Sequence, residues 1–188
     1  MPRHVALLRA INVGGHTVKM ADLRAHFESL GFKRVETFIA SGNVIFDARS
    51  SDAKALQRKI EKSLRDRLGY EVATILRSPE EMAAVARYKP FGDAQLASSA
   101  IFYVGFFAEP LNAEATRVIM GLHTDIDDFH VNGREMYWLC KMKSLDSTFS
   151  AQRLEKTLKA PVTFRGMKTV VRCQIRLQWA RSPCDLCG

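Results

Sequence analysis

Near the start of the chain stands the stretch Leu8-Arg9-Ala10-Ile11-Asn12-Val13-Gly14-Gly15, and the stretch Ser41-Gly42-Asn43-Val44-Ile45-Phe46 follows it. An apolar run that begins at His4 ends in Arg and Asn and passes into a double-glycine turn, as a strand does when it leaves a sheet. Ser-Gly-Asn is also turn chemistry, and the apolar residues behind it return as a strand. The two stretches therefore predict a buried first strand and a hairpin.

The first half of the chain alternates between strand and helix patterns. Two segments carry apolar residues at helical spacing, and a glycine follows each of them. The predicted elements are strands 4–10, 35–39, 44–46 and 72–76 and helices 20–30 and 56–68. Their order, β-α-β-β-α-β, is that of the split-βαβ or ferredoxin-like unit.

The same order recurs in the second half. Asn132-Gly133 separates two β-rich runs and is a strong signal for a tight hairpin. The predicted elements are strands 101–107, 125–131, 135–140 and 162–165 and helices 113–121 and 147–159. The sequence therefore predicts an α+β fold of two tandem ferredoxin-like (βαββαβ) units packed together.

The two halves are joined by a bridging helix. Ser78-Pro79-Glu80-Glu81 combines an N-cap, a proline at the first helical position and a capping-box glutamate, and the helix is expected to end near Arg87. The segment 90–99 is the most loop-like one inside the chain. We therefore predict units at 1–92 and 93–180, followed by a flexible tail at 181–188.

Both faces of the first strand, and of strand 101–107, are apolar. Helices cover only one face of the sheet in a split-βαβ unit, so the other face must be buried against something else. The two units packing on one another is the economical solution, and a homodimer is the alternative.

The charge is unevenly distributed along the 188 residues, whose formal net charge is +8. Residues 95–140 hold two Lys/Arg against six Asp/Glu, a net −4, whereas residues 141–188 hold ten against three, a net +7. The basic C-terminal quarter is compatible with nucleic acid or a phosphorylated ligand, or is simply a solvated surface.

We expect a cytoplasmic protein. No apolar run approaches the ~20 residues that span a bilayer, and Arg9 interrupts the short apolar run at the N-terminus. Cys140 and Cys173 lie in apolar segments and are interpreted as buried. Cys184 and Cys187 form a C-x-x-C, read as part of a disordered tail, a metal site shared across a dimer or a redox pair. We predict no metal site within the chain and no cofactor.

The chain resembles an uncharacterised bacterial family, the domain of unknown function 1697. The resemblance is most specific at residues 7–46. It continues at Thr163-Phe164-Arg165-Gly166-Met167-Lys168-Thr169, where the family pattern is Thr-x-Arg-Asn-Trp-x-Thr and Gly166 and Met167 replace the amide and the indole. Residues 168–178 fit a strand or a helix, and the resemblance favours the helix. The family has no agreed activity.

The double-glycine turn is the first candidate ligand site. Glycines between a strand and a helix let backbone N–H groups point at an anion, and the helix N-terminus adds positive potential. Arg9 and Lys19 would supply side-chain charge there. The alternative is that Asn12 only shapes the turn and that Arg9 pairs with an internal carboxylate.

Further candidates lie elsewhere in the chain. Ser41 and Asn43 belong to the hairpin turn, at whichever end of the sheet that turn falls, and the resemblance adds Thr163, Arg165 and Thr169. In each case the alternative is a purely structural turn, strand end or helix cap. The complete predicted ligand set is Arg9, Asn12, Gly14, Gly15, Lys19, Ser41, Asn43, Thr163, Arg165 and Thr169.

No standard catalytic constellation is present, so enzymatic activity is left open. His26, four residues after Asp22, suggests at most an exposed pair on a helix. We expect a binding module for a small anionic or phosphorylated ligand. The alternatives are a nucleic-acid-binding protein that uses its basic C-terminal quarter and a structural or oligomerisation protein without a ligand. The chain is expected to be a monomer or a homodimer with no membrane partner.

Overall fold

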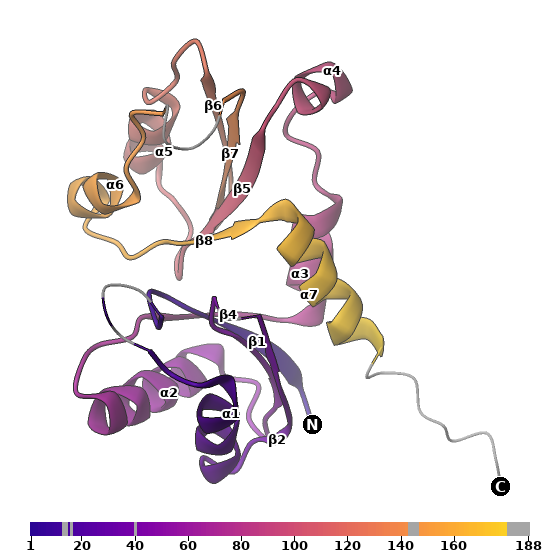
Figure 1. Ribbon diagram of the computed structural model, residues 1–188, viewed down its shortest axis with the longest axis vertical. Helices are drawn as coiled ribbons and strands as arrows, with labels where there is room; N and C mark the ends of the chain where they lie inside the picture. The colour runs from indigo at the N-terminus through magenta and orange to yellow at the C-terminus, as the bar shows by residue number, and fades with distance from the viewer. Residues whose placement is uncertain (13–14, 16, 40, 143–146, 180–188) are drawn as a thin grey trace, which may run out of the picture. The chain divides into compact units, whose positions relative to one another are not determined.

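The computed structural model describes residues 1–188 except 13–14, 16, 40, 143–146 and 180–188. The first unit is a four-stranded antiparallel sheet with two helices on one face (Figure 1). Its elements are β1 (Arg3–Leu8), α1 (Met20–Ser29), β2 (Lys33–Phe38), β3 (Asn43–Asp47), α2 (Ala53–Leu68) and β4 (Thr74–Arg77). The strand order is β2-β3-β1-β4, which makes β1 and β3 central. This is the arrangement that the β-α-β-β-α-β order predicted.

The second unit repeats this arrangement with different residues. Its elements are β5 (Ile101–Phe106), α5 (Ala113–Met120), β6 (Asp127–Asn132), β7 (Glu135–Cys140), α6 (Ala151–Leu158) and β8 (Thr163–Gly166). The strand order β6-β7-β5-β8 corresponds position for position to that of the first sheet. The duplicated α+β architecture is therefore confirmed.

Alternation along the strands builds the core of the first unit. Ala6 and Leu8 of β1 lie on the same face as Val44 and Phe46 of β3, and this face packs against apolar residues of α1 and α2. All four side chains are fully buried. Each large one removed from water stabilises the fold by about 1.5–3 kcal/mol before the entropy of ordering it is counted.

The opposite face of this sheet is also buried. Val5, Leu7, Ile45 and Ile75 share it by strand register, and each is at most 1% exposed. The packing of the two units on one another remains a prediction, and so does the alternative, a homodimer.

Part of the C-terminal helix α7 (Met167–Trp179) lies over this second face at β2. The guanidinium groups of Arg172 and Arg176 lie 4.8 and 4.7 Å from the ring centroid of Phe38. Arg176 also forms an ion pair with Glu36. The helix predicted over 168–178 is thus confirmed, and its two arginines are engaged by the first unit.

Two further helices connect the units. α3 (Pro79–Arg87) begins with the expected capping box, in which the Ser78 N–H donates to Glu81 Oε2 at 2.8 Å and the Glu81 N–H donates to Ser78 Oγ at 3.2 Å. The expectation of a loop throughout 90–99 is wrong, because α4 (Asp93–Ala97) lies there. Gln95 Oε1 accepts the Gly92 N–H at 3.0 Å and so stabilises the first turn of this short helix.

The chain divides into two compact units, one of residues 1–84 with the described residues from Val171 onward and the other of residues 85–170. The division falls within α3, whereas the sequence placed its boundary after residue 92. The tail with Cys184 and Cys187 lies outside the described residues.

Both hairpin turns fall where they were predicted. The first separates β2 from β3 and contains Ser41 and Gly42, and the second joins Asn132 to its partner Glu135. Ile39, which was expected to end β2, instead has φ +51° and lies in the turn. A β-branched residue in this left-handed region cannot continue a strand.

Candidate functional site

The hairpin turn of the first unit lies beside the end of β1. Leu7 pairs with Asn43, and the Leu8 N–H donates to the Gly42 carbonyl at 2.8 Å. Of the two places that the sequence left open for Ser41 and Asn43, the structure selects the end of the sheet from which the Arg9 turn departs.

Two amide side chains hold these turns in shape. Asn12 Oδ1 accepts the Val18 N–H at 2.6 Å and thereby closes the loop before α1. Asn43 is fully buried, and its Nδ2 donates to the Phe38 carbonyl and to Ser41 Oγ, both at 3.0 Å. Both residues therefore have a structural role.

The structure does not assign a ligand-binding role to the other predicted residues of this loop. Arg9 is half-buried, and its backbone N–H donates to the Ala73 carbonyl at 2.9 Å. Lys19 is exposed at the N-cap of α1, and Gly15 has φ +89°. Gly14 lies outside the described residues. A binding role for this loop stays a prediction.

Thr163, Arg165 and Thr169 belong to the second unit. Arg165 is buried, and its Nη1 donates to Thr163 Oγ1 at 2.7 Å and to the Phe164 carbonyl at 2.8 Å. Thr169 lies in the first turn of α7. The contacts of Arg165 give the Thr163–Arg165 pair a structural role at the end of β8.

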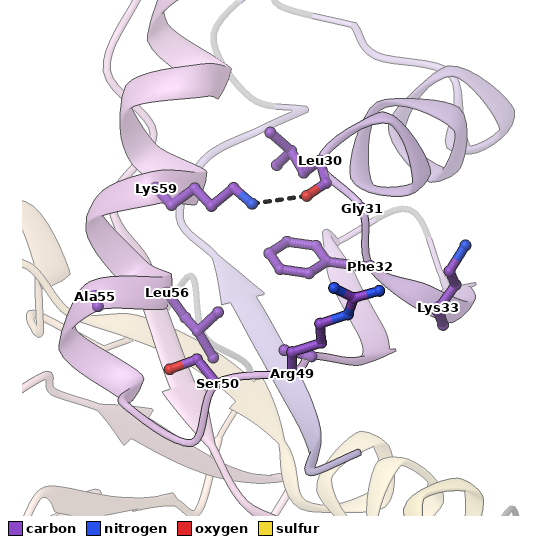
Figure 2. Close-up of a pocket in the computed structure, with 10 residues that line it drawn as sticks. Leu30, Gly31, Phe32, Lys33, Arg49, Ser50, Ala55, Leu56 and Lys59 are labelled. Atoms are coloured by element: carbon purple, nitrogen blue, oxygen red, sulfur yellow. Dashed lines mark hydrogen bonds between the residues drawn. The ribbon is translucent and has the colours of Figure 1, made fainter.

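The first unit also contains a hollow that is formed by three segments and that no sequence motif predicted. It has a volume of about 520 Å³ and lies between the α1–β2 connection, the residues after β3 and the first turns of α2 (Figure 2). Its lining residues are Leu30, Gly31, Phe32, Lys33, Ala48, Arg49, Ser50, Ala55, Leu56 and Lys59. We call it the α1–α2 pocket. Its volume is within the range of small-molecule sites, about 300–1,000 Å³.

Local sequence explains each wall of the α1–α2 pocket. Gly31, at φ +84°, turns the chain after α1 so that Phe32 points inward. The centroid of the Phe32 ring lies 4.4 Å from the ring centroid of Phe46 and 5.9 Å from that of Phe27. Asp52 caps α2 by accepting the Ala55 N–H at 3.0 Å. The helical spacing of Ala55, Leu56 and Lys59 then places all three on the pocket wall.

Three cationic side chains surround an apolar floor. Lys59 Nζ donates to the Leu30 carbonyl at 2.7 Å and lies 5.2 Å from the centroid of the Phe32 ring. Lys33 and Arg49 are exposed, and neither has an ion-pair partner among the described residues. The described lining holds no Asp or Glu. The pocket is thus electrically suited to an anion.

Two buried histidines lie in the same unit. Burial lowers the pKa of His4, against the opposing effects of a backbone hydrogen bond at Ser50 and of the Glu81 and Asp47 charges. Burial likewise lowers the pKa of His26, helped by the positive charge of Arg67. His26 is 5% exposed and its Nε2 lies 3.1 Å from Ser63 Oγ, so the expectation of an exposed pair with Asp22 is wrong.

The described lining of the α1–α2 pocket carries one hydroxyl group. Ser50 is its hydroxyl-bearing residue, and Ser50 Oγ accepts the Asp52 N–H at 3.1 Å. The described lining contains no histidine, cysteine or carboxylate to activate it. Nor do the described residues include a group of three or more His, Cys, Asp or Glu placed to hold a metal ion.

Sequence reasoning missed the pocket because its cations are far apart in the chain and look like ordinary solvated charges. The only available signal was indirect. In the structure Lys33 begins β2 and pairs in register with Asp47 of β3, and Arg49 lies two residues beyond Asp47, but all three fall just outside the predicted strands 35–39 and 44–46. Among the helices of the described part of the chain, none is long and apolar enough to cross a bilayer.

Comparison with known proteins places the chain without assigning an activity. No curated protein matches it. The structure is similar to that of the conserved bacterial protein SP0830 from Streptococcus pneumoniae, with 26% sequence identity and a TM-score of 0.72 over 95% of this chain and 99% of that one. The family model described as "Protein of unknown function (DUF1697)" matches residues 1–137, which include the Arg9 loop and every residue of the α1–α2 pocket. On this evidence the chain belongs to the DUF1697 family of proteins of unknown function.

Proposed function

We propose that the first unit binds a small organic anion in the α1–α2 pocket. The observation that carries this proposal is the pairing of an apolar floor with Lys33, Arg49 and Lys59 and with no acidic residue in the described lining. Apolar lining with a few polar or charged groups is typical of ligand sites. The cytoplasm stays the predicted location.

The corresponding corner of the second unit supports a division of roles. There the centroid of the Phe149 ring lies 4.7 Å from the ring centroid of Trp138 and 5.2 Å from that of Phe129. Buried Asp127 accepts hydrogen bonds from Trp138 Nε1 at 2.7 Å and Ser147 Oγ at 2.8 Å. Among the described residues, aromatic rings pack together here beside the buried Asp127 carboxylate, and a carboxylate disfavours an anion.

Nucleic-acid binding through the basic C-terminal quarter is less well supported. Arg165 is buried among backbone and hydroxyl acceptors, whereas Arg172 and Arg176 are exposed but lie over Phe38, and Arg176 also pairs with Glu36. A phosphate backbone needs exposed cations. Part of the positive charge of the C-terminal quarter is therefore engaged in contacts within the fold.

The test is an NMR titration of ¹⁵N-labelled protein with benzoate, phenyl phosphate and the neutral control benzyl alcohol. Binding in the α1–α2 pocket should shift the amide signals of Gly31, Phe32 and Arg49 with at least one of the two anions. Benzyl alcohol should shift them less. The proposal is wrong if neither anion moves these signals at 10 mM or if Arg49→Gln leaves the shifts intact.

The matched control variant is Arg58→Gln. Arg58 is an exposed cation on α2, next to Lys59 in sequence, but it does not line the pocket. It carries the same charge, so its loss reports the general effect of a less positive surface. Arg58→Gln should retain the shifts that Arg49→Gln abolishes.

A further inference from the structure

We infer that the anion is a phosphate monoester with an apolar substituent; this inference rests on the function proposed for the α1–α2 pocket. Figure 2 shows Arg49 and Lys33 coming from the β2–β3 side, whereas Lys59 comes from α2 beyond the Phe32 ring. Lys33 begins β2 and pairs in register with Asp47, and Arg49 follows two residues after Asp47, so the charged head group binds between these two cations.

The donors available on each cation favour a head group with three oxygens. Lys59 already donates to the Leu30 carbonyl and lies over Phe32, so its role is to position the pocket wall. The planar fork of Arg49 can donate to two oxygens at once, and Lys33 can donate to another. A carboxylate, with two oxygens and one charge, cannot satisfy both cations as fully as a phosphate dianion can.

The two carboxylates that flank Arg49 in the sequence do not compete for it, because Asp47 pairs with Arg3 and Arg34. Asp52 Oδ1 faces the Ala55 N–H and caps α2. Ser50 adds a donor, because its Oγ accepts the Asp52 N–H and keeps its hydroxyl proton to give to a ligand oxygen. Arg49 and Lys33 therefore offer charge and hydrogen bonds for the head group, while Ser50 lies farther along the rim, beside the first turn of α2 (Figure 2).

The apolar floor requires more than inorganic phosphate. Leu30, Ala48 and Leu56 line the pocket beside Phe32 and offer no hydrogen bonds from their side chains. Phe32, Ala48 and Leu56 are already buried, but Leu30 and Ala55 are half-buried, and an organic substituent packed against them would remove their remaining apolar surface from water. The chemical class is therefore an ester that bears one apolar group.

The test measures dissociation constants for phenyl phosphate, benzoate and inorganic phosphate by NMR at pH 8, where the phosphate monoester is a dianion. Phenyl phosphate should bind at least fivefold more tightly than each of the other two. Lys33→Gln should weaken phenyl phosphate at least threefold more than it weakens benzoate, and Arg58→Gln should weaken neither.

The outcomes separate this inference from the proposed function. If benzoate binds within fivefold of phenyl phosphate, the pocket still binds organic anions but the phosphate class is wrong. If inorganic phosphate binds within fivefold of phenyl phosphate, the apolar substituent is wrong. If neither organic anion binds at the α1–α2 pocket, the proposed function and this inference fail together.

Discussion

Lys59 on α2 donates a hydrogen bond from Nζ to the backbone carbonyl of Leu30, at the C-terminal end of α1, at 2.7 Å. The bond joins two helices that are separated in sequence by a strand hairpin, and it forms one wall of the α1–α2 pocket (Figure 2). The carbonyl is one of those left without an intrahelical partner at a helix end. A surface lysine thus positions the site.

Lys59→Met should lower the free energy of unfolding by about 0.5–1 kcal/mol, because it removes one hydrogen bond and one exposed cation–π contact. It should also weaken anion binding by loosening the wall. Chemical denaturation and the NMR titration measure the two effects. Arg58→Gln is the control, and equal losses in both variants would contradict a positioning role for Lys59.

Asp47 anchors two arginines at the end of β3, a central strand of the first sheet. It is 2% exposed and accepts a hydrogen bond from Arg3 Nη1 at 3.0 Å, and it also pairs with Arg34. Asp47→Ala should cost about 3–5 kcal/mol, because it leaves buried Arg3 without its counter-charge. Arg34→Ala should cost about 0.2–1 kcal/mol, because the Arg34 side chain is 59% exposed. Urea denaturation that gave similar costs for the two variants would show that burial does not govern this network.

Gly42 allows the hairpin turn to approach β1. It has φ +77°, and an added Cβ would lie 2.6 Å from Ile11 Cγ2 and 3.1 Å from Leu8 Cβ. Gly42→Ala should therefore cost about 2–4 kcal/mol from backbone strain and overpacking together. The matched control is Gly133→Ala, at φ +61° with nothing within 4 Å, which should cost about 1–2 kcal/mol. Thermal unfolding compares the two, and a cost for Gly42→Ala no greater than that of the control would rule out the close approach.

Stability should fall as the pH drops below the ordinary histidine pKa of 6.5. Burial lowers the pKa of both His4 and His26 in the folded state, so the unfolded chain binds these protons first. The stabilisation is fully present above pH 6.5 and is lost as the pH falls from there toward the lower folded values. His4→Gln and His26→Gln should each flatten the dependence of the free energy of unfolding on pH between 7 and 5. Variants with the parent slope would contradict the assignment.

The sequence predicted the topology well because each unit carries its own local signals. Helical spacing in α2, the capping box at Ser78 and the turn residues at Ser41 and Asn132 each act over a few residues. Local signals fail where conformation depends on a neighbour. The segment 90–99 reads as a loop, yet Gln95 accepts the Gly92 N–H and a short helix forms.

The candidate site was harder to predict because turn residues and binding residues have similar chemistry. Asn12 and Asn43 were selected as candidate ligand contacts, but each amide holds backbone groups of its own turn. The cations of the α1–α2 pocket carry no motif, and only strand register and the turn at Gly31 bring Lys33 and Arg49 to one hollow. A pocket formed by three segments depends on tertiary geometry that residue spacing does not encode.

The most direct test of the central claim is a crystal structure of the protein grown with phenyl phosphate. The account predicts electron density in the α1–α2 pocket, with the phosphate against Arg49 and Lys33 and the ring on the apolar floor beside Phe32. Density at the Arg9 to Lys19 turn with the pocket empty, or no density in the pocket at a saturating concentration of phenyl phosphate, would contradict it.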